Sequence, residues 1–155
     1  MKDLTMMVDE NVKLNVRTTG IFMNGKKILV HKCDEGHYAL PGGRVQANED
    51  SITALKREVV EELNLEIENI NFMGVVENFF TVIEANYHEY MWMIKSEFKD
   101  KSVYDKERII GCEQDKQLIF EWVDIEKLKD INFRPIGVIP YLQNIDGKVH
   151  HIIIK

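Results

Sequence analysis

Three glutamates, Glu58, Glu61 and Glu62, are spaced so that a helix would place all of them on one face. Like charges at these spacings repel by about 0.2–0.5 kcal/mol per pair on an isolated helix. They also fall toward the helix C-terminus, where the macrodipole does not stabilise negative charge. A bound cation would offset this repulsion, and carboxylate oxygens suit the hard cations Mg²⁺ and Mn²⁺.

The helix that would carry these glutamates is predicted over Asp50–Leu63, with Asp50 as its N-cap. Asn64 follows it, and asparagine tolerates the left-handed conformation that commonly ends a helix. Apolar residues recur at helical spacing and predict the buried side, namely Ile52, Leu55, Val59 and Leu63. The glutamates flank this apolar stripe, which places them at the rim of a cleft.

A glycine-containing segment, Pro41-Gly42-Gly43, precedes the helix and is predicted to be a turn or loop. Glycines let the backbone approach a ligand or metal and expose its carbonyl oxygens. Between this segment and the glutamates, Glu49 and Arg57 have opposite charges. Their pairing would fix the loop against the helix.

These residues resemble the Nudix box, Gx5Ex7REUxEExGU, in which U is aliphatic. Gly43, Glu49 and the segment Arg57–Leu65 match every charged position and every spacing of that motif. The one departure is Asn64, where the family has glycine. Asparagine is the best non-glycine residue for a left-handed cap, so the match holds.

The resemblance implies an α/β fold, a Nudix α/β/α sandwich with a mixed β-sheet flanked by helices, as a single domain over residues 1–155. It also implies hydrolysis of a nucleoside diphosphate linked to another moiety, with divalent cations bound by the box glutamates. If the family's residue roles hold at the matching positions, Glu58, Glu61 and Glu62 would bind Mg²⁺ or Mn²⁺ together with the carbonyl of Gly42. The expected catalytic residues are Glu58, which would orient or deprotonate the attacking water, Glu61 and Arg57.

Many members of the family use a further glutamate from a loop outside the box. Glu113 lies in the polar segment Lys99–Lys116, which is predicted to be a surface loop, and it is favoured for this role. The alternative is Glu121, which is next to Trp122 in a predicted strand and would then face solvent.

Substrate contacts are predicted less specifically. Arginine favours bidentate phosphate contacts, and Arg44, which adjoins Gly43, is preferred over Arg17. Phe79 and Phe80 are predicted to lie between strands, where they could stack on a nucleobase. Outside the box, Glu77–Phe80 with His88-Glu89 resembles one subgroup of small bacterial Nudix proteins, without naming a substrate.

Composition limits the class of protein. The chain has 155 residues, 45% of them hydrophobic, and a formal net charge of −6 without a long basic stretch. A nucleic-acid polymer and an anionic membrane are therefore not expected partners. No apolar run reaches the ~20 residues of a membrane span, and the N-terminus lacks a signal-peptide core. Cys33 and Cys112 are expected to be reduced thiols in a cytoplasmic protein. The histidines form no HxxxH pair, so no histidine zinc site is expected.

The remaining elements follow from hydrophobic patterning and turn residues. Asn24-Gly25 predicts a hairpin. Strands are expected at Val12–Ile21, Ile67–Val76, Tyr87–Phe98, Leu118–Val123 and Val149–Ile154, and helical segments at Asp124–Leu128 and Pro135–Leu142. Strands separated by a few helices favour a mixed sheet with helices packed on it.

The substrate prediction is a nucleoside diphosphate-linked small molecule. Because no added domain is present to hold a second large moiety, a (deoxy)nucleoside triphosphate, cut to the monophosphate and pyrophosphate, is favoured. Nucleotide sugars, ADP-ribose and dinucleoside polyphosphates stay open. The rival is a non-catalytic Nudix nucleotide-sensing module. An EF-hand is disfavoured because no DxDxDG loop is present. Small Nudix proteins often dimerise, so a homodimer is considered.

Overall fold

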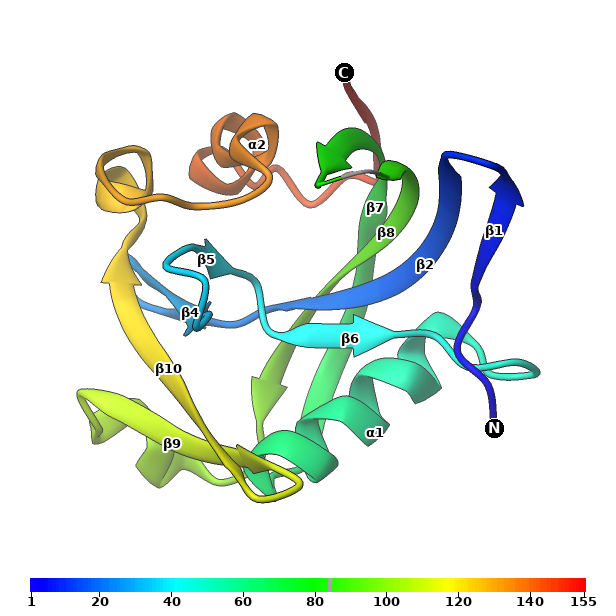
Figure 1. The fold of residues 1–155 in the computed structure, drawn as a ribbon. Coiled ribbons are helices and arrows are strands. Elements are labelled where there is room, and N and C mark those ends of the chain that lie inside the picture. The colour runs from blue at the N-terminus through cyan, green and yellow to red at the C-terminus, as the bar shows by residue number, and fades with distance from the viewer. Residues whose placement is uncertain (84) are drawn as a thin grey trace.

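The computed structural model describes residues 1–83 and 85–155 and contains two β-sheets (Figure 1). The main sheet is mixed, because β2 pairs with β8 in parallel and β7 pairs with β11 in parallel, whereas its other pairs are antiparallel. Its strands, in spatial order, are β1 (Thr5–Asp9), β2 (Val12–Ile21), β8 (Ala85–Phe98), β7 (Ile67–Val82) and β11 (His150–Ile154), with β6 (Gly42–Arg44) on β2.

The second sheet is antiparallel. Its strands, in spatial order, are β3 (Met23–Asn24), β4 (Lys27–Lys32), β10 (Lys116–Asp124) and β9 (Arg108–Glu113), with β5 (Tyr38–Ala39) on β4. The predicted hairpin at Asn24-Gly25 connects β3 to β4, and Gly25 has a φ of 59°.

Helices lie on both sides of the strands, as Figure 1 shows for α1 and α2. The α-helices are α1 (Ser51–Leu63) and α2 (Ile139–Gln143), and the 3-10 helices are η1 (Lys101–Asp105), η2 (Ile125–Asp130) and η3 (Ile136–Val138). One core cluster joins Leu55 and Val59 of α1 to both sheets, and a second joins Leu142 of α2 to both sheets. This arrangement confirms the expected α/β/α sandwich. In the described part of the chain, no helix is long and apolar enough to cross a membrane.

The helix α1 begins and ends as its sequence predicts. Asp50 accepts hydrogen bonds from the backbone N–H groups of Ile52 and Thr53, both at 2.9 Å. Asn64 adopts the left-handed conformation, with φ 53° and ψ 39°. Leu55 of the predicted apolar stripe is fully buried.

Three predicted loops are strands in the structure. Gly42 and Gly43 belong to β6, because their backbones pair with Thr19 and Thr18 of β2. The polar segment 99–116 contains η1 and β9, and β9 forms because its Ile109 packs into the core while its backbone pairs with β10. The third, the segment around Phe79 and Phe80, is described with the substrate candidates below.

Candidate metal centre

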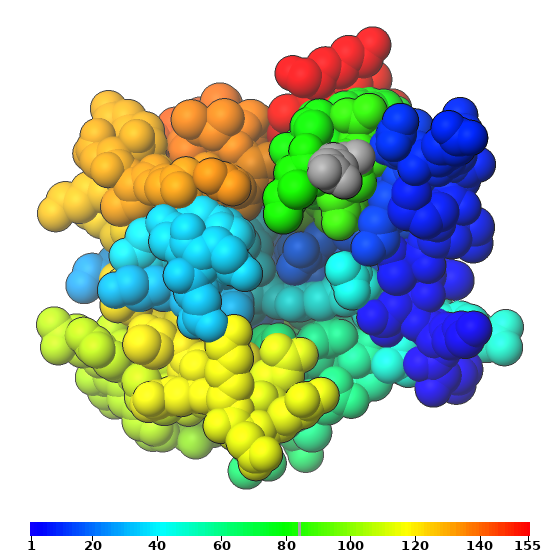
Figure 2. All heavy atoms as spheres, in the orientation of Figure 1, coloured from blue at the N-terminus to red at the C-terminus, as the bar shows by residue number. Residues whose placement is uncertain are grey.

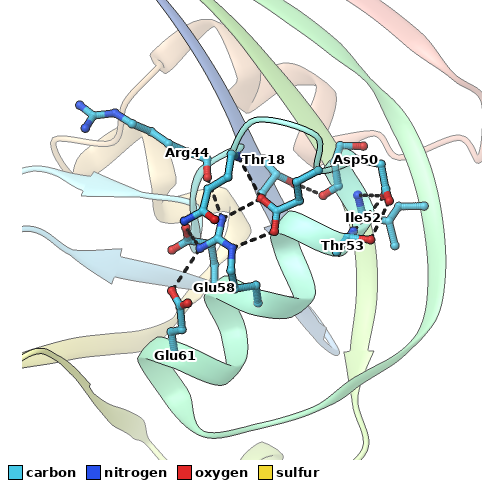
Figure 3. A network of polar contacts seen from close by, with 11 residues as sticks. Thr18, Arg44, Asp50, Ile52, Thr53, Glu58 and Glu61 are labelled. Atoms are coloured by element: carbon cyan, nitrogen blue, oxygen red, sulfur yellow. Dashed lines mark hydrogen bonds and ion pairs between the residues drawn. The ribbon is translucent and has the colours of Figure 1, made fainter. Parts of the chain in front are cut away.

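Arg57 joins the loop after β6 to the face of α1 that carries Glu58 and Glu61, which are labelled in Figure 3. Its guanidinium forms a bidentate ion pair with Glu49, with N···O distances of 2.8 Å and 3.0 Å. The Nη1 atom also donates to Glu58 at 2.7 Å and to Glu61 at 3.1 Å. One arginine therefore fixes both the loop and two of the three candidate ligands.

The loop that leads into α1 is held by the same pair. Arg57 Nη2 donates to the backbone carbonyl of Arg44 at 2.9 Å, and Glu49 Oε2 accepts the backbone N–H of Gln46 at 2.9 Å. The hydrogen bonds from Arg57 lower the pKa of the Glu49 carboxyl, which is thereby held ionised. Glu49 and Arg57 thus form the structural pair that the sequence suggests.

Glu58 lies directly against Gly43. A Cβ placed on Gly43 would be 2.3 Å from the carboxylate carbon of Glu58, so only glycine leaves room for this side chain. The Glu58 side chain is 13% exposed. Its burial raises the pKa of the carboxyl, and the bond to Arg57 opposes that shift.

Glu62 is a half-buried carboxylate that has no counter-ion among the described residues. Burial, together with the charges of Glu58 and Glu113, raises its pKa to about 8. Among the described residues, no ion pair or hydrogen bond to this carboxylate is formed within the protein. An uncompensated carboxylate beside two other acids is what a cation site requires, because a bound cation would restore the ionised form.

The expected fourth acid, Glu113, approaches from β9. This strand packs closely on the end of α1, and a Cβ on Gly111 would be 2.4 Å from the Glu62 carbonyl oxygen. Glu113 is two residues further along and so lies on the same face of β9. It acts on the pKa of Glu62, whereas Glu121 pairs with Val30 and Arg108 inside the second sheet. Glu113 therefore suits the role better than Glu121.

The donor set fits Mg²⁺ or Mn²⁺. Carboxylates of Glu58, Glu61 and Glu62 are hard oxygen ligands, and Glu113 offers a fourth. Gly42 has a φ of 145°, and a Cβ there would be 2.1 Å from the carbonyl oxygen of Thr18. The backbone therefore needs glycine here to run this close to β2, in the strand that also borders Glu58.

The aromatic substrate candidates lie elsewhere than predicted. Phe79 and Phe80 are inside β7, not between strands, because their backbones pair with His88 and Tyr87 of β8. Phe79 packs on His88 with ring centroids 4.4 Å apart, and Phe80 on Tyr87 at 4.8 Å. As neighbours in one strand their side chains point to opposite faces, and both residues border one hollow in the surface.

Arg44, which was predicted to contact phosphate beside Gly43, does not point toward the carboxylates of α1. Figure 3 shows its side chain pointing away from Glu58 and Glu61, while its carbonyl faces the guanidinium of Arg57. Its Nε donates to Oδ1 of Asn15 at 3.2 Å. The Arg44 side chain therefore extends over β2 and away from the carboxylates.

Two polar groups were not anticipated by the sequence analysis. One is a buried row across the main sheet, formed by Asn15, Glu89 and Asn78, which are 4%, 4% and 7% exposed. Asn15 and Glu89 fall inside predicted strands, whereas Asn78 falls in the segment predicted to separate two strands. The other is Cys33, Glu35 and His37, whose ligand atoms lie within 4.8 Å of one another and could hold a metal ion, although the histidines of the sequence form no HxxxH pair. Both cysteines are free, as expected.

Comparison with known proteins identifies the family. The model of the NUDIX domain matches residues 14–142. Over 119 residues, the chain is 29% identical to the 8-oxo-dGTP diphosphatase of Buchnera aphidicola subsp. Schizaphis graminum, which covers 74% of this chain and 80% of that protein.

Solved structures share the fold at low sequence identity. An ADP-ribose pyrophosphatase from Streptococcus suis has a TM-score of 0.62 at 12% identity, covering 90% of this chain and 98% of that one. The MutT protein from Bacillus halodurans has a TM-score of 0.58 at 16% identity, covering 88% and 89%.

Proposed function

The chain belongs to the Nudix family and is a Nudix hydrolase, and on that premise we propose that it cuts a diphosphate linkage in a nucleoside diphosphate derivative with Mg²⁺. The observation that carries the proposal is the acidic face of α1. There Arg57 holds Glu58 and Glu61, while the half-buried Glu62 has no counter-ion among the described residues. A non-catalytic sensor would have no need of all three carboxylates.

The carboxylates of Glu58, Glu61 and Glu62 would hold Mg²⁺, which would supply charge neutralisation and polarisation of the diphosphate. Glu58 takes a proton from the attacking water, the water oxygen forms a bond to one phosphorus, and the bond from that phosphorus to the bridging oxygen breaks, so that the other phosphoryl group leaves. One oxygen of Glu58 accepts from Arg57, which orients the carboxylate. Burial raises the pKa of Glu58, and a higher pKa makes a carboxylate a stronger proton acceptor. Arg57 therefore acts on the reaction by orienting Glu58.

For the substrate we favour a (deoxy)nucleoside triphosphate, cut to the monophosphate and pyrophosphate. The relative named 8-oxo-dGTP diphosphatase supports this choice. The alternative is a nucleotide sugar or ADP-ribose, and the structural neighbour named ADP-ribose pyrophosphatase supports that reading. Both alternatives use the same metal centre and differ in the group attached to the diphosphate.

A substrate screen tests the proposal. The protein is incubated with triphosphates, oxidised triphosphates, nucleotide sugars and ADP-ribose, each with Mg²⁺, with Mn²⁺ and with EDTA. Phosphate and pyrophosphate release are then measured. We expect turnover of a triphosphate that EDTA abolishes. Tight nucleotide binding without turnover of any compound, unaffected by EDTA, would instead support the sensing module.

We also propose that the enzyme works in the cytoplasm, because both cysteines are free in the structure. The assembly is open, and the family resemblance makes a homodimer one candidate. Light scattering across a range of protein concentrations measures the mass directly, and a monomer at all concentrations would rule the homodimer out.

A further inference from the structure

Two arginines face each other at the edge of the main sheet. Arg17 of β2 lies opposite Arg44 of β6 in the antiparallel register. Paired residues of neighbouring strands project to the same face, and like charges directly opposite each other are destabilising. On the other face, Thr18 donates to the carbonyl of Ser51 and Gly43 borders Glu58. The arginine pair therefore lies on the face away from α1.

These positive charges have little compensation within the protein. The Nε atom of Arg17 is buried and has no hydrogen-bond acceptor among the described residues. In the same part of the chain, no carboxylate oxygen lies within ion-pair distance of Arg17. Arg44 Nη1 is 3.8 Å from Asp3, and both side chains are well exposed, so this pair contributes little.

The arginines nevertheless lie close to the metal centre. Arg44 follows Gly43, which borders the Glu58 carboxylate, and its carbonyl accepts from Arg57 at 2.9 Å. Arg17 is paired with Arg44, so both arginines lie next to the strand that borders the carboxylates. A phosphate group held at the metal centre would supply the counter-charge that the arginines lack.

A buried hydrogen-bond chain fixes the direction of Arg44. Its Nε donates to Asn15 Oδ1 at 3.2 Å, and Asn15 Nδ2 donates to Glu89 Oε2 at 2.6 Å. Asn78 Nδ2 also lies 3.4 Å from the second oxygen of Glu89. These side chains come from β2, β8 and β7, so the rigid sheet sets the position of the guanidinium.

We propose that Arg17 and Arg44 form a phosphate clamp that binds the substrate's phosphoryl oxygens, with Asn15 and Glu89 as positioning residues for Arg44. The inference rests on the proposed function and names the residues that hold the anionic part of the substrate. Guanidinium groups suit this task because their fork of N–H donors matches phosphate. Figure 2 shows a hollow in the surface near the place where β2 and β6 run side by side in Figure 1, bordered by the cyan, green and blue segments of the chain.

Inorganic pyrophosphate in EDTA is a probe that needs neither metal nor turnover. Its affinity is measured by calorimetry for the wild type and for Arg17→Met and Arg44→Met. We expect each variant to bind about ten- to hundredfold more weakly, since each loses charge-assisted hydrogen bonds. Arg108→Met, an exposed arginine at the start of β9, is the matched control and should bind as the wild type does.

Two results would overturn the clamp. One is wild-type affinity in both arginine variants, and the other is no pyrophosphate binding by the wild type. Arg17→Lys is a conservative second variant that is expected to disturb the fold less. It keeps the positive charge and loses only the forked N–H donors of the guanidinium group. It should bind with intermediate affinity, and circular dichroism checks that every variant is folded.

The positioning role is tested by a double-mutant cycle. Asn15→Ala should weaken pyrophosphate binding in the wild type and have no further effect in Arg44→Met. Glu89→Gln, which keeps an acceptor for Asn15, should retain most of the affinity that Glu89→Ala loses. If the loss of pyrophosphate affinity caused by Asn15→Ala adds fully to the loss caused by Arg44→Met, Asn15 does not act through Arg44.

The clamp and the proposed function fail in different ways. If the wild type binds pyrophosphate through these arginines and hydrolyses no substrate with Mg²⁺, the proposed hydrolysis is wrong and the anion site remains. If the wild type hydrolyses a triphosphate and the arginine variants keep its KM and its pyrophosphate affinity, the clamp is wrong and the enzyme assignment remains.

Discussion

The three glutamates of α1 have different surroundings, which suggests different tasks. Glu58 is 13% exposed and bonded to Arg57, Glu61 is 57% exposed, and Glu62 is half-buried with no counter-ion among the described residues. An exposed carboxylate can release and bind a cation readily. A carboxylate withdrawn from solvent favours the state with a bound cation, because its ionised form is costly without one.

Replacing the candidate base and its neighbour should remove most activity. Glu58→Gln and Glu61→Gln are each expected to lower kcat by at least ~10²-fold, since a well-placed general base or ligand contributes that much. Steady-state kinetics on the substrate found by the screen measures this. Glu66→Gln, which loses only an exposed ion pair with Lys99, is the control. Near-normal turnover in both test variants would contradict the assigned roles.

The further glutamate can be identified from the metal requirement. Glu113→Gln should raise the Mg²⁺ concentration for half-maximal activity by roughly tenfold, as loss of groups around a metal site commonly does. Glu121→Gln is the matched comparison and should leave it unchanged. The opposite pattern would assign the role to Glu121, the alternative on β10.

At the scale of elements, α1 was predictable because its signals are local. Asp50, the apolar stripe and Asn64 determine where it begins, which side is buried and where it ends. The strand β6 was not predictable in this way. Its glycines indicate a loop, and only pairing with β2, more than twenty residues earlier in the chain, makes it a strand. The clamp residue Arg44 lies on β6, so its direction could not be predicted either.

Gly43 allows a direct test of how β6 positions the site. Gly43→Ala places a methyl group where the Glu58 carboxylate lies, so that side chain must move. We expect kcat/KM to fall by about 10²-fold, the effect of misplacing a catalytic group by about 1 Å. The melting temperature should change little, because the φ of Gly43 is one that alanine accepts.

Gly25→Ala is the control for this variant. Gly25 has a φ of 59° with open space around it, so alanine there strains the β3–β4 turn without touching the site. It should lower stability and leave kcat/KM intact. Full activity in Gly43→Ala would show that Glu58 does not need its present position.

The ion pair between the loop and α1 should stabilise the fold in a pH-dependent way. Glu49→Gln is expected to lower the free energy of unfolding by about 1.5–3 kcal/mol at pH 7, the contribution of hydrogen bonds to a charged group. The pKa of Glu49 is lowered from 4.5 in the folded state. This stabilisation is therefore complete above pH ~4.5 and is lost as the pH falls through the folded-state pKa.

Urea unfolding at pH 7, 5 and 3 measures this contribution. The difference between wild type and Glu49→Gln should be largest at pH 7 and should narrow toward pH 3. Asp105→Asn, at the end of η1, controls for removal of a carboxylate elsewhere. A difference that stays constant with pH would show that the ionised form of Glu49 is not what stabilises the loop.

For the whole molecule, the pairing of distant segments decides the architecture. β2 lies in parallel beside β8, about seventy residues later, and their pairing brings Asn15 next to Glu89. Strand patterns in the sequence indicate which face is buried but not which strand is the neighbour. The expected mixed sheet was therefore correct in kind. The buried polar row that orients Arg44 exists only because of the observed strand order.

The two sheets should unfold together. Each core cluster contains residues of both sheets: Met91 with Val30 in one, and Ile94 with Phe120 in the other, beside Leu55 of α1. Neither sheet can keep its core without the other, which predicts one cooperative transition.

Single-tryptophan variants test this coupling, because Trp92 reports on the main sheet and Trp122 on the second sheet. Urea unfolding is followed by fluorescence in Trp122→Phe and in Trp92→Phe, and by circular dichroism in each. Within each variant, fluorescence and circular dichroism should give the same midpoint. In Trp122→Phe, a fluorescence midpoint that differs from the circular dichroism midpoint would show that the two sheets unfold separately. If the second sheet has the lower midpoint, the metal centre loses β9, and with it Glu113, first.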